Sequence, residues 1–278
     1  DYFLDNKSYS RSIYNNSFNF LKINTSNKKN INFNVKNDEV LFKPIFIKKK
    51  SKKKLVLFLM VDGLNNGLTK LMPNTNKFFG SKNKFSNAWT NSEWTLPTFG
   101  NLISGKYTSN HMCVKHNTFY STYLNQLTPS RQTKMNVKKN MFEYFRDMDF
   151  VTGCYSPYVR INPTYEFEKG VDILKHCERH STSEIIDNII AQIEMFDNTS
   201  NLIFSHFFDT HGPIKDYIRL NEYSSFPDKN YFFGKKNEKN SIKFLKDDYE
   251  EIKLKSAFAN VDKYLFFLFE YLKRKKFD

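Results

Sequence analysis

The chain has 278 residues, 40% of them hydrophobic, with 9 Gly and 8 Pro, so its composition excludes a disordered protein. The formal net charge is +14, but the lysines are spread along the chain and no nucleic-acid-binding motif accompanies them, so we expect no nucleic-acid partner.

Cys113, Cys154 and Cys177 are widely separated and exclude a disulfide framework. The sequence contains neither a signal peptide nor an apolar run long enough to span a membrane, and it predicts no compartment.

Residues 1–52 form a polar segment rich in Asn and Lys. Within it, residues 31–47 alternate apolar and polar side chains on both sides of Lys36-Asn37-Asp38. This pattern predicts a small hairpin. We expect a separate N-terminal segment, followed by one larger domain over residues 53–278.

The first strong element of the larger domain is the run LVLFLMV, Leu55 to Val61, which ends at Asp62-Gly63. A strand that is apolar on both faces belongs in a sheet covered by helices on each side. MPNTNKFF then predicts a short helix with proline in its first turn. A strand is expected near residues 85–89, and a helix over residues 98–104 that stops at Gly105.

Strand and helix patterns go on alternating toward the C-terminus. Residues 136–150 have helical spacing, FVTGCYS predicts a strand, and Ser181 with Glu184 predicts a capping box for a helix reaching residue 196. NLIFSHFF predicts a second buried strand, and apolar residues recur at helical spacing from Leu254 to Leu272. The pattern indicates a three-layer α/β/α sandwich with a largely parallel mixed sheet.

Ligands of such sheets bind beyond the carboxyl ends of the strands. Asp62 follows the first strand, where it is either a ligand for a divalent cation or an ordinary turn residue. Thr95 precedes the predicted helix, where it is either an N-cap or a nucleophile beside an anion held by the helix N-terminus. Asp209 and His211 follow the later strand, and His211 could protonate a leaving oxygen or contact a substrate anion. His206, inside that strand, is interpreted as a packed core residue.

Six segments, in this order, resemble the sulfatase branch of the alkaline phosphatase superfamily: LVLFLMVDGL, MPNTNKFF, SEWTLPTFGNLISGKY, YEFEKGVD, FFDTHGPI and YEEIKLKSAFANVDKYLFFLFEYLK. The resemblance covers the chain from about residue 54 onward. It implies an alkaline-phosphatase-like fold and an enzyme that hydrolyses or transfers a phosphate or sulfate ester. The substrate would be an anionic small molecule, glycan or lipid headgroup.

The same resemblance implies roles for single residues. Asp62 and Thr95 would bind a divalent metal ion (Ca, Mg, Mn or Zn), Thr95 would be the nucleophile, and His211, with Asp209, would contact the substrate. Sulfatases carry a Cys or Ser that is oxidised to formylglycine, followed by an arginine. Thr95 cannot undergo that oxidation and Phe99 stands in the arginine position, so the sequence favours phosphoryl transfer over sulfate-ester hydrolysis.

Two further departures bear on activity. The family carries two adjacent aspartates after the first strand, whereas here Gly63 follows Asp62. The family's later metal ligands follow the long helix directly, whereas here the sequence ends in KRKKFD. We therefore expect that the C-terminal part of the domain is missing and that these 278 residues alone are inactive. The alternative is a non-catalytic sulfatase-like protein that binds an anionic glycan or partner.

Overall fold

A computed structural model describes residues 2–4, 7–9, 31–33, 45, 47, 50–80, 83–85, 87–92, 94–113, 135–158, 161, 167–178, 181–211, 248–275 and 277. The chain divides into two compact units, residues 1–47 and residues 48–278. In the first unit, β1 (Tyr2–Leu4) pairs antiparallel with both β2 (Lys7–Tyr9) and β3 (Ile31–Phe33). The second arm of the predicted hairpin lies almost wholly outside the described residues, so that hairpin stays a prediction.

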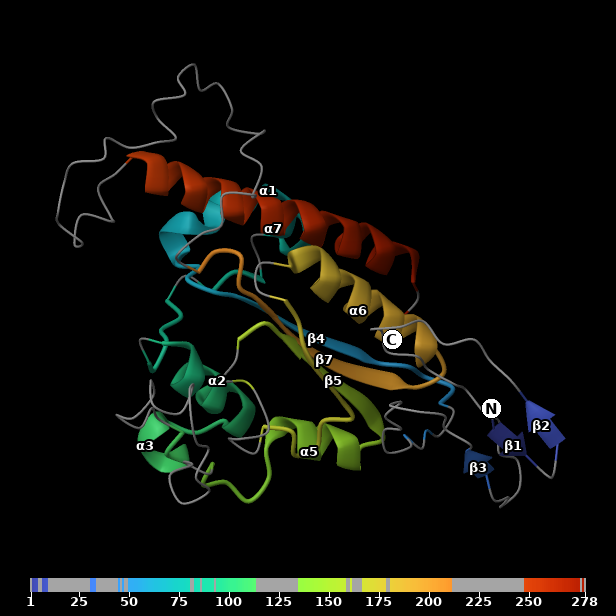
Figure 1. Ribbon diagram of the computed structural model, residues 1–278. Coiled ribbons are helices and arrows are strands. Elements are labelled where there is room, and N and C mark those ends of the chain that lie inside the picture. Colours follow the sequence, from blue (N-terminus) through green and yellow to red (C-terminus); the bar gives the residue numbers. More distant parts are fainter. Residues whose placement is uncertain are drawn as a thin grey trace, which may run out of the picture. The chain divides into compact units, whose positions relative to one another are not determined.

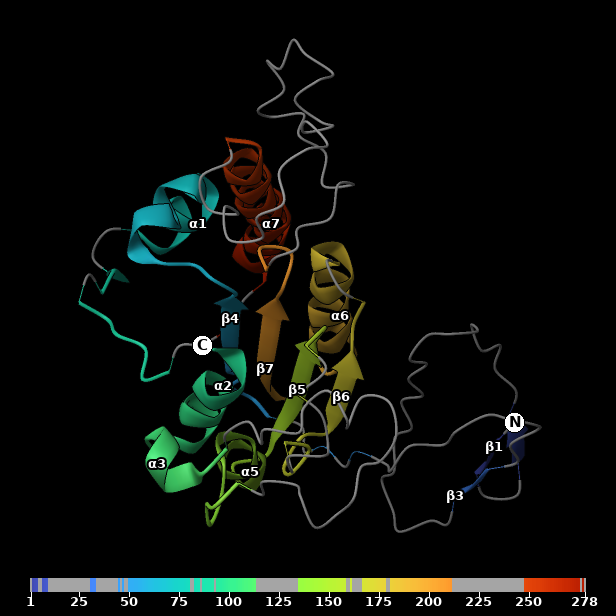
Figure 2. The ribbon, with the colours of Figure 1, turned by 60° about the vertical axis from the view of Figure 1, so that its left-hand side comes forward.

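The second unit is built on a parallel sheet with the strand order β4-β7-β5-β6 (Figure 2). These strands are β4 (Leu55–Val61), β5 (Phe150–Ser156), β6 (Ile173–His176) and β7 (Ser200–Phe207). The sequence predicts β4, β5 and β7 correctly. It does not predict β6, because four residues are too few to show a periodicity.

Helices cover both faces of the sheet (Figure 1). One face carries α6 (Thr182–Met195) and α7 (Asp248–Arg274), with α1 (Pro73–Phe79) and η1 (Asn66–Leu71) packed on α7. The opposite face carries α2 (Thr95–Ser104), α3 (Thr108–His111) and α5 (Met141–Asp147). The second unit is therefore a three-layer α/β/α sandwich, as the sequence predicts.

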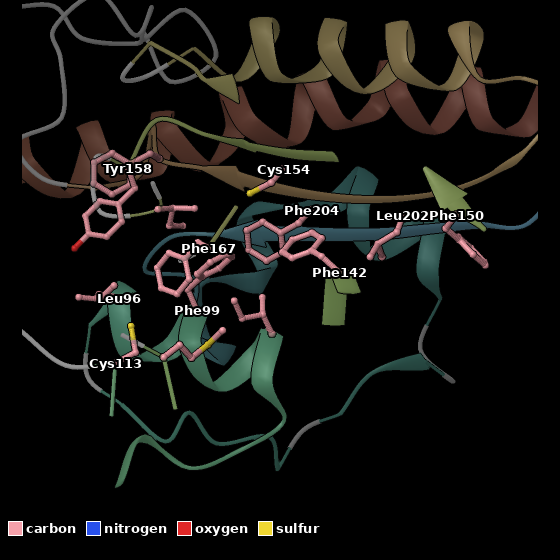
Figure 3. Packing of buried hydrophobic residues seen from close by; sticks show 14 residues of the cluster. Leu96, Phe99, Cys113, Phe142, Phe150, Cys154, Tyr158, Phe167, Leu202 and Phe204 are labelled. Atoms are coloured by element: carbon pink, nitrogen blue, oxygen red, sulfur yellow. The ribbon is translucent and has the colours of Figure 1, made fainter. Parts of the chain in front are cut away.

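The main hydrophobic core lies between the sheet and α2 (Figure 3). The Phe99 ring on α2 packs edge-on against Phe204 of β7, at 4.8 Å between centroids, and against Phe167, at 4.7 Å. All three side chains have no exposed surface. Burying one such side chain stabilises the fold by about 1.5–3 kcal/mol, so this packing holds α2 firmly against the sheet.

Some local predictions are wrong in detail. The described residues among 83–89 contain no strand, and Phe85 and Trp89 are exposed. The helix predicted over 136–150 begins only at Met141, because Asn140 and Glu143 form a capping box there. Ser181 precedes α6, but its hydroxyl donates to the Glu184 carboxylate and does not cap the helix.

Candidate active site

Asp62 follows β4 and is held there by the end of β7. Its N–H donates to the Phe207 carbonyl at 3.0 Å, which extends the strand pairing by one residue. Its own carbonyl accepts the Thr210 hydroxyl at 2.6 Å. Gly63 turns the chain away with a φ of 66°, which favours glycine. The backbone of Asp62 is thus fixed at the carboxyl edge of the sheet.

Helix α2 brings Thr95 to the same edge. The helix begins at Thr95, three residues before the predicted start, and Pro97 lies in its first turn, where its missing N–H costs no intrahelical hydrogen bond. Leu96 and Phe99 are fully buried in the core, so the packing of α2 determines where its first residue lies. Trp94 occupies the N-cap position without a side-chain cap. Thr95 is therefore a residue of the helix itself and not its cap.

The Thr95 hydroxyl is free for another partner because it does not cap the helix. It donates a hydrogen bond to Asp62 Oδ2 at 3.0 Å. Thr95 is 8% exposed, so only a small part of the residue reaches the surface. The structure thus brings together two of the residues predicted from the sequence, although they are 33 positions apart.

His206 and Ser156 join this site from the neighbouring strands. His206 Nε2 lies 3.1 Å from Asp62 Oδ2, and His206 Nδ1 lies 3.1 Å from Ser156 Oγ. Neither residue was predicted to belong to the site. His206 is fully buried, as its interpretation as a core residue implied, but its ring also contacts Asp62. The only indication in the sequence that His206 belongs to the site is its position close to the end of a predicted strand.

The surroundings of Asp62 keep its carboxyl group ionised. Burial raises the pKa of Asp62, but hydrogen bonds from His206 and Thr95, together with electrostatic interactions with His206 and His211, more than offset that effect and hold the pKa below its ordinary value. In the part of the chain that the structure describes, Oδ2 receives both hydrogen bonds and Oδ1 has no hydrogen-bond partner. An anionic oxygen is therefore available beside the Thr95 hydroxyl.

His211 lies close to this group. Its ring stacks on Phe208 with 4.2 Å between centroids and an interplanar angle of 15°. The backbone N–H of His211 donates to the backbone carbonyl of Phe208. An electrostatic interaction with His211 contributes to the low pKa of Asp62, so the ring lies within electrostatic range of the carboxylate. His211 is partly exposed, so a ligand can reach it from solvent.

Asp209 points elsewhere. It is 1% exposed, and Oδ2 accepts the hydroxyl of Thr182, the first residue of α6, at 2.7 Å. Burial raises the pKa of Asp209, and hydrogen bonds from Thr182 only partly offset that effect. This contact ties β7 to the N-terminus of α6. It also favours an anchoring role for Asp209 over the predicted contact with a substrate.

The fit of a divalent metal ion depends on the number and type of ligands. Asp62 and Thr95 supply oxygen donors of the kind that divalent ions prefer. Such an ion takes about four to eight ligands, usually with more than one carboxylate. No cluster of three or more His, Cys, Asp or Glu side chains suited to a metal ion occurs among the described residues. The donors are of the right kind, but the described residues do not form a complete metal centre.

The parallel sheet with helices on both faces agrees with the alkaline-phosphatase-like fold that the sequence resemblance leads us to expect. A scan against protein-family models and a search of curated proteins found no match. A search of solved structures supports the fold. None of the described helices has the length and apolar character that crossing a bilayer requires.

Two solved structures illustrate the similarity. The C-terminal periplasmic domain of phosphoethanolamine transferase EptC from Campylobacter jejuni matches with a TM-score of 0.51 and 14% identity, over 84% of this chain and 68% of that domain. The protein yidJ from Bacteroides fragilis, assigned provisionally to the sulfatases, matches with a TM-score of 0.52 and 15% identity, over 83% of this chain and 61% of that one. The second unit of this chain therefore shares its fold with the EptC domain and with yidJ.

Proposed function

We propose that this protein is a phosphoryl-transfer enzyme in which the Thr95 hydroxyl attacks the phosphorus of an anionic phosphate ester. One observation carries the proposal: Thr95 Oγ1, at the N-terminus of a helix, donates to the ionised Asp62 carboxylate at 3.0 Å. A hydroxyl that donates to a carboxylate has an acceptor for its proton when it attacks. The fold shared with a phosphoethanolamine transferase domain agrees with this class of reaction.

In the proposed reaction, the Thr95 oxygen forms a bond to phosphorus while the bond from phosphorus to the leaving oxygen breaks. The Thr95 proton passes to Asp62, and the leaving oxygen takes a proton from His211 or from water. Water, or a second hydroxyl compound, then accepts the phosphoryl group from Thr95. The products are an alcohol and either inorganic phosphate or a new phosphate ester.

Asp62 alone is a weak base for this step, because a carboxyl group with a low pKa provides little driving force for proton transfer. The free N–H groups and positive dipole end of α2 favour negative charge on the phosphoryl oxygens. A proton on His211 would add positive charge near Asp62. The proposal includes a divalent ion, for which Asp62 and Thr95 would be two of the ligands. When bound, the ion would supply charge that stabilises the threonine alkoxide.

Sulfate esters are the less favoured substrates. Sulfatases of this fold depend on a formylglycine, which Thr95 cannot become. Phosphate monoesters and diesters need only an oxygen nucleophile and stabilisation of the anionic oxygens. We therefore propose a substrate with an anionic phosphate ester in a small molecule, glycan or lipid headgroup.

The test compares Thr95 variants of the protein expressed from its complete open reading frame, with divalent ions in the buffer. The substrates are p-nitrophenyl phosphate, bis(p-nitrophenyl) phosphate and p-nitrophenyl sulfate. We expect Thr95→Ala to lose about three orders of magnitude in kcat, as expected for removal of a nucleophile. Thr95→Ser should keep activity, and acid quenching should trap a phosphate on Thr95 that mass spectrometry detects.

The matched control is Thr98→Ala. Thr98 lies on the same helix turn, but its hydroxyl donates to the Trp94 carbonyl at 2.9 Å and not to Asp62. This variant should keep wild-type activity. Retention of most activity by Thr95→Ala, or a preference for p-nitrophenyl sulfate, would contradict the proposal. Tight binding of phosphate without turnover of any ester would favour the alternative, a non-catalytic protein that binds an anionic partner.

A further inference from the structure

We propose that His206 is a positioning residue for the Thr95 nucleophile. In this proposal the ring donates through Nε2–H to Asp62 and so holds the carboxylate where it receives the Thr95 hydroxyl, while Ser156 keeps the ring in the tautomer that can donate. The inference rests on the proposed function for the role of Thr95. It adds His206 and Ser156 as residues that position the reacting groups without reacting themselves.

The strand order places these groups in one row. Met60 pairs with His206 in register, and Tyr155 pairs with Ser205, so that Ser156 and His206 are also side by side. Side chains alternate between the two faces of a strand, so Asp62 lies on the same face as Met60. Asp62, His206 and Ser156 therefore lie next to one another on the face that α2 covers, across β4, β7 and β5.

The hydrogen bonds around Ser156 are compatible with the tautomer of His206 that donates to Asp62. Ser156 Oγ accepts the Tyr158 N–H at 3.1 Å. If Ser156 O–H donates to Nδ1, the proton of a neutral ring is on Nε2 and points to Asp62 Oδ2. Both ring nitrogens of His206 and the Ser156 hydroxyl then have a partner.

The opposite tautomer would bring two lone pairs, on His206 Nε2 and Asp62 Oδ2, to within 3.1 Å of each other. That contact is repulsive, and the fully buried His206 ring has no exposed surface at which water could relieve it. The geometry therefore favours the ring that carries its proton on Nε2.

Donation from His206 restricts the Asp62 side chain. Asp62 begins a turn, and its carboxylate would otherwise be free to rotate about χ1 and χ2. With Nε2–H and the Thr95 hydroxyl both on Oδ2, each donor limits the direction of the other. His206 is buried beneath Asp62 and has no exposed surface with which to touch a substrate. Its loss should therefore change the rate of attack and leave substrate binding unchanged.

The experiment uses His206→Leu, His206→Gln and Ser156→Ala, with p-nitrophenyl phosphate as substrate and inorganic phosphate as inhibitor. His206→Leu should lower kcat about 10- to 100-fold, the range expected for a nucleophile misplaced by about 1 Å. Its KM and its inhibition by phosphate should stay at the wild-type values. His206→Gln, whose amide N–H can reach Asp62, should recover most of kcat, and Ser156→Ala should lie between the two.

Ser205→Ala is the matched control. Ser205 precedes His206 on β7, has its side chain on the opposite face of the sheet, and has a buried hydroxyl without a hydrogen-bond partner in the described structure. It should keep wild-type kcat. A wild-type kcat in His206→Leu, or an equal loss in His206→Gln and His206→Leu, would overturn the inference.

A second measurement does not depend on catalytic activity. Nitrogen-15 NMR of the histidine rings, assigned by comparison with His206→Gln, should show a proton on Nε2 of His206. A ring protonated only at Nδ1 would overturn the inference. Failure of the proposed function would be visible separately, as full activity of Thr95→Ala and no phosphate trapped on Thr95, and would leave the NMR result unaffected.

Discussion

Asp262, on α7, holds Thr75 at the start of α1: its Oδ1 accepts the Thr75 N–H at 2.8 Å and the Thr75 hydroxyl at 2.7 Å. Its Oδ2 accepts the N–H and the side-chain amide of Asn74, at 2.9 and 2.8 Å. One carboxylate that is 2% exposed therefore satisfies two backbone donors in the first turn of a helix that lies 187 residues away in the chain. The motif MPNTN is thus tied to the long C-terminal helix.

The first prediction follows from this contact. Asp262→Ala should lower the free energy of unfolding by about 1–3 kcal/mol, because it leaves partly buried donors of α1 without an acceptor. Asp262→Asn should cost nearly as much, since its amide hydrogens would face the same donors. Urea unfolding measures the loss, and Lys263→Ala, at the exposed next position, is the control. A loss below about 0.5 kcal/mol, typical of a surface substitution, would show that this carboxylate does not stabilise α1.

The second prediction concerns Gly153 in the middle of β5. A Cβ atom there would lie 1.9 Å from Gln192 Oε1, which accepts the Tyr155 hydroxyl at 2.8 Å. Gly153→Ala must displace this buried amide, and we expect a loss of about 1–3 kcal/mol, as for other overpacked cores.

A double-mutant cycle with Gln192→Ala checks the cause. If the clash with Gln192 is responsible, Gly153→Ala should cost clearly less in the Gln192→Ala background than in the wild type. Equal costs in both backgrounds would mean that the backbone of β5, and not the amide, makes alanine unfavourable there.

The third prediction concerns pH. The pKa of Asp62 in the folded protein is below its ordinary value of 3.8. Ionisation of Asp62 therefore stabilises the fold above the ordinary pKa, and this contribution disappears as the pH falls through the lower, folded pKa. The difference in unfolding free energy between wild type and Asp62→Asn should be constant from pH 7 to about pH 5 and should decrease below that. Denaturant unfolding at several pH values measures it, and a difference that grows on acidification would contradict the low pKa.

The fourth prediction concerns metal binding by these 278 residues alone. Asp62 and Thr95 supply one carboxylate and one neutral hydroxyl, fewer donors than the roughly four to eight that a divalent ion takes. Calorimetry with Zn, Mn, Ca and Mg should therefore detect only weak binding. Micromolar binding of any of these ions that is lost in Asp62→Ala would show that the ligand set is complete within this chain.

Much of the architecture follows from local patterns. A continuous apolar run identifies β4, and the spacing of Phe258, Val261, Leu265 and Leu268 identifies the buried side of α7. Both signals are periodic and extend over many residues, so they show the element and its buried face directly. The alternation of strands and helices then favours a parallel sheet, whose carboxyl edge brings Asp62 and Thr95 together.

The tertiary structure alone decided how that edge is arranged. His206 and Ser156 join Asp62 because β7 lies between β4 and β5, an order that no local pattern specifies. Asp209 turns to Thr182 because α6 begins beside the end of β7. Thr95 keeps its hydroxyl for Asp62 because the packing of Leu96 and Phe99 starts α2 at Thr95. Residue type and chain position determine which side chains can react, but pairing between strands as far as 144 positions apart determines which of them meet.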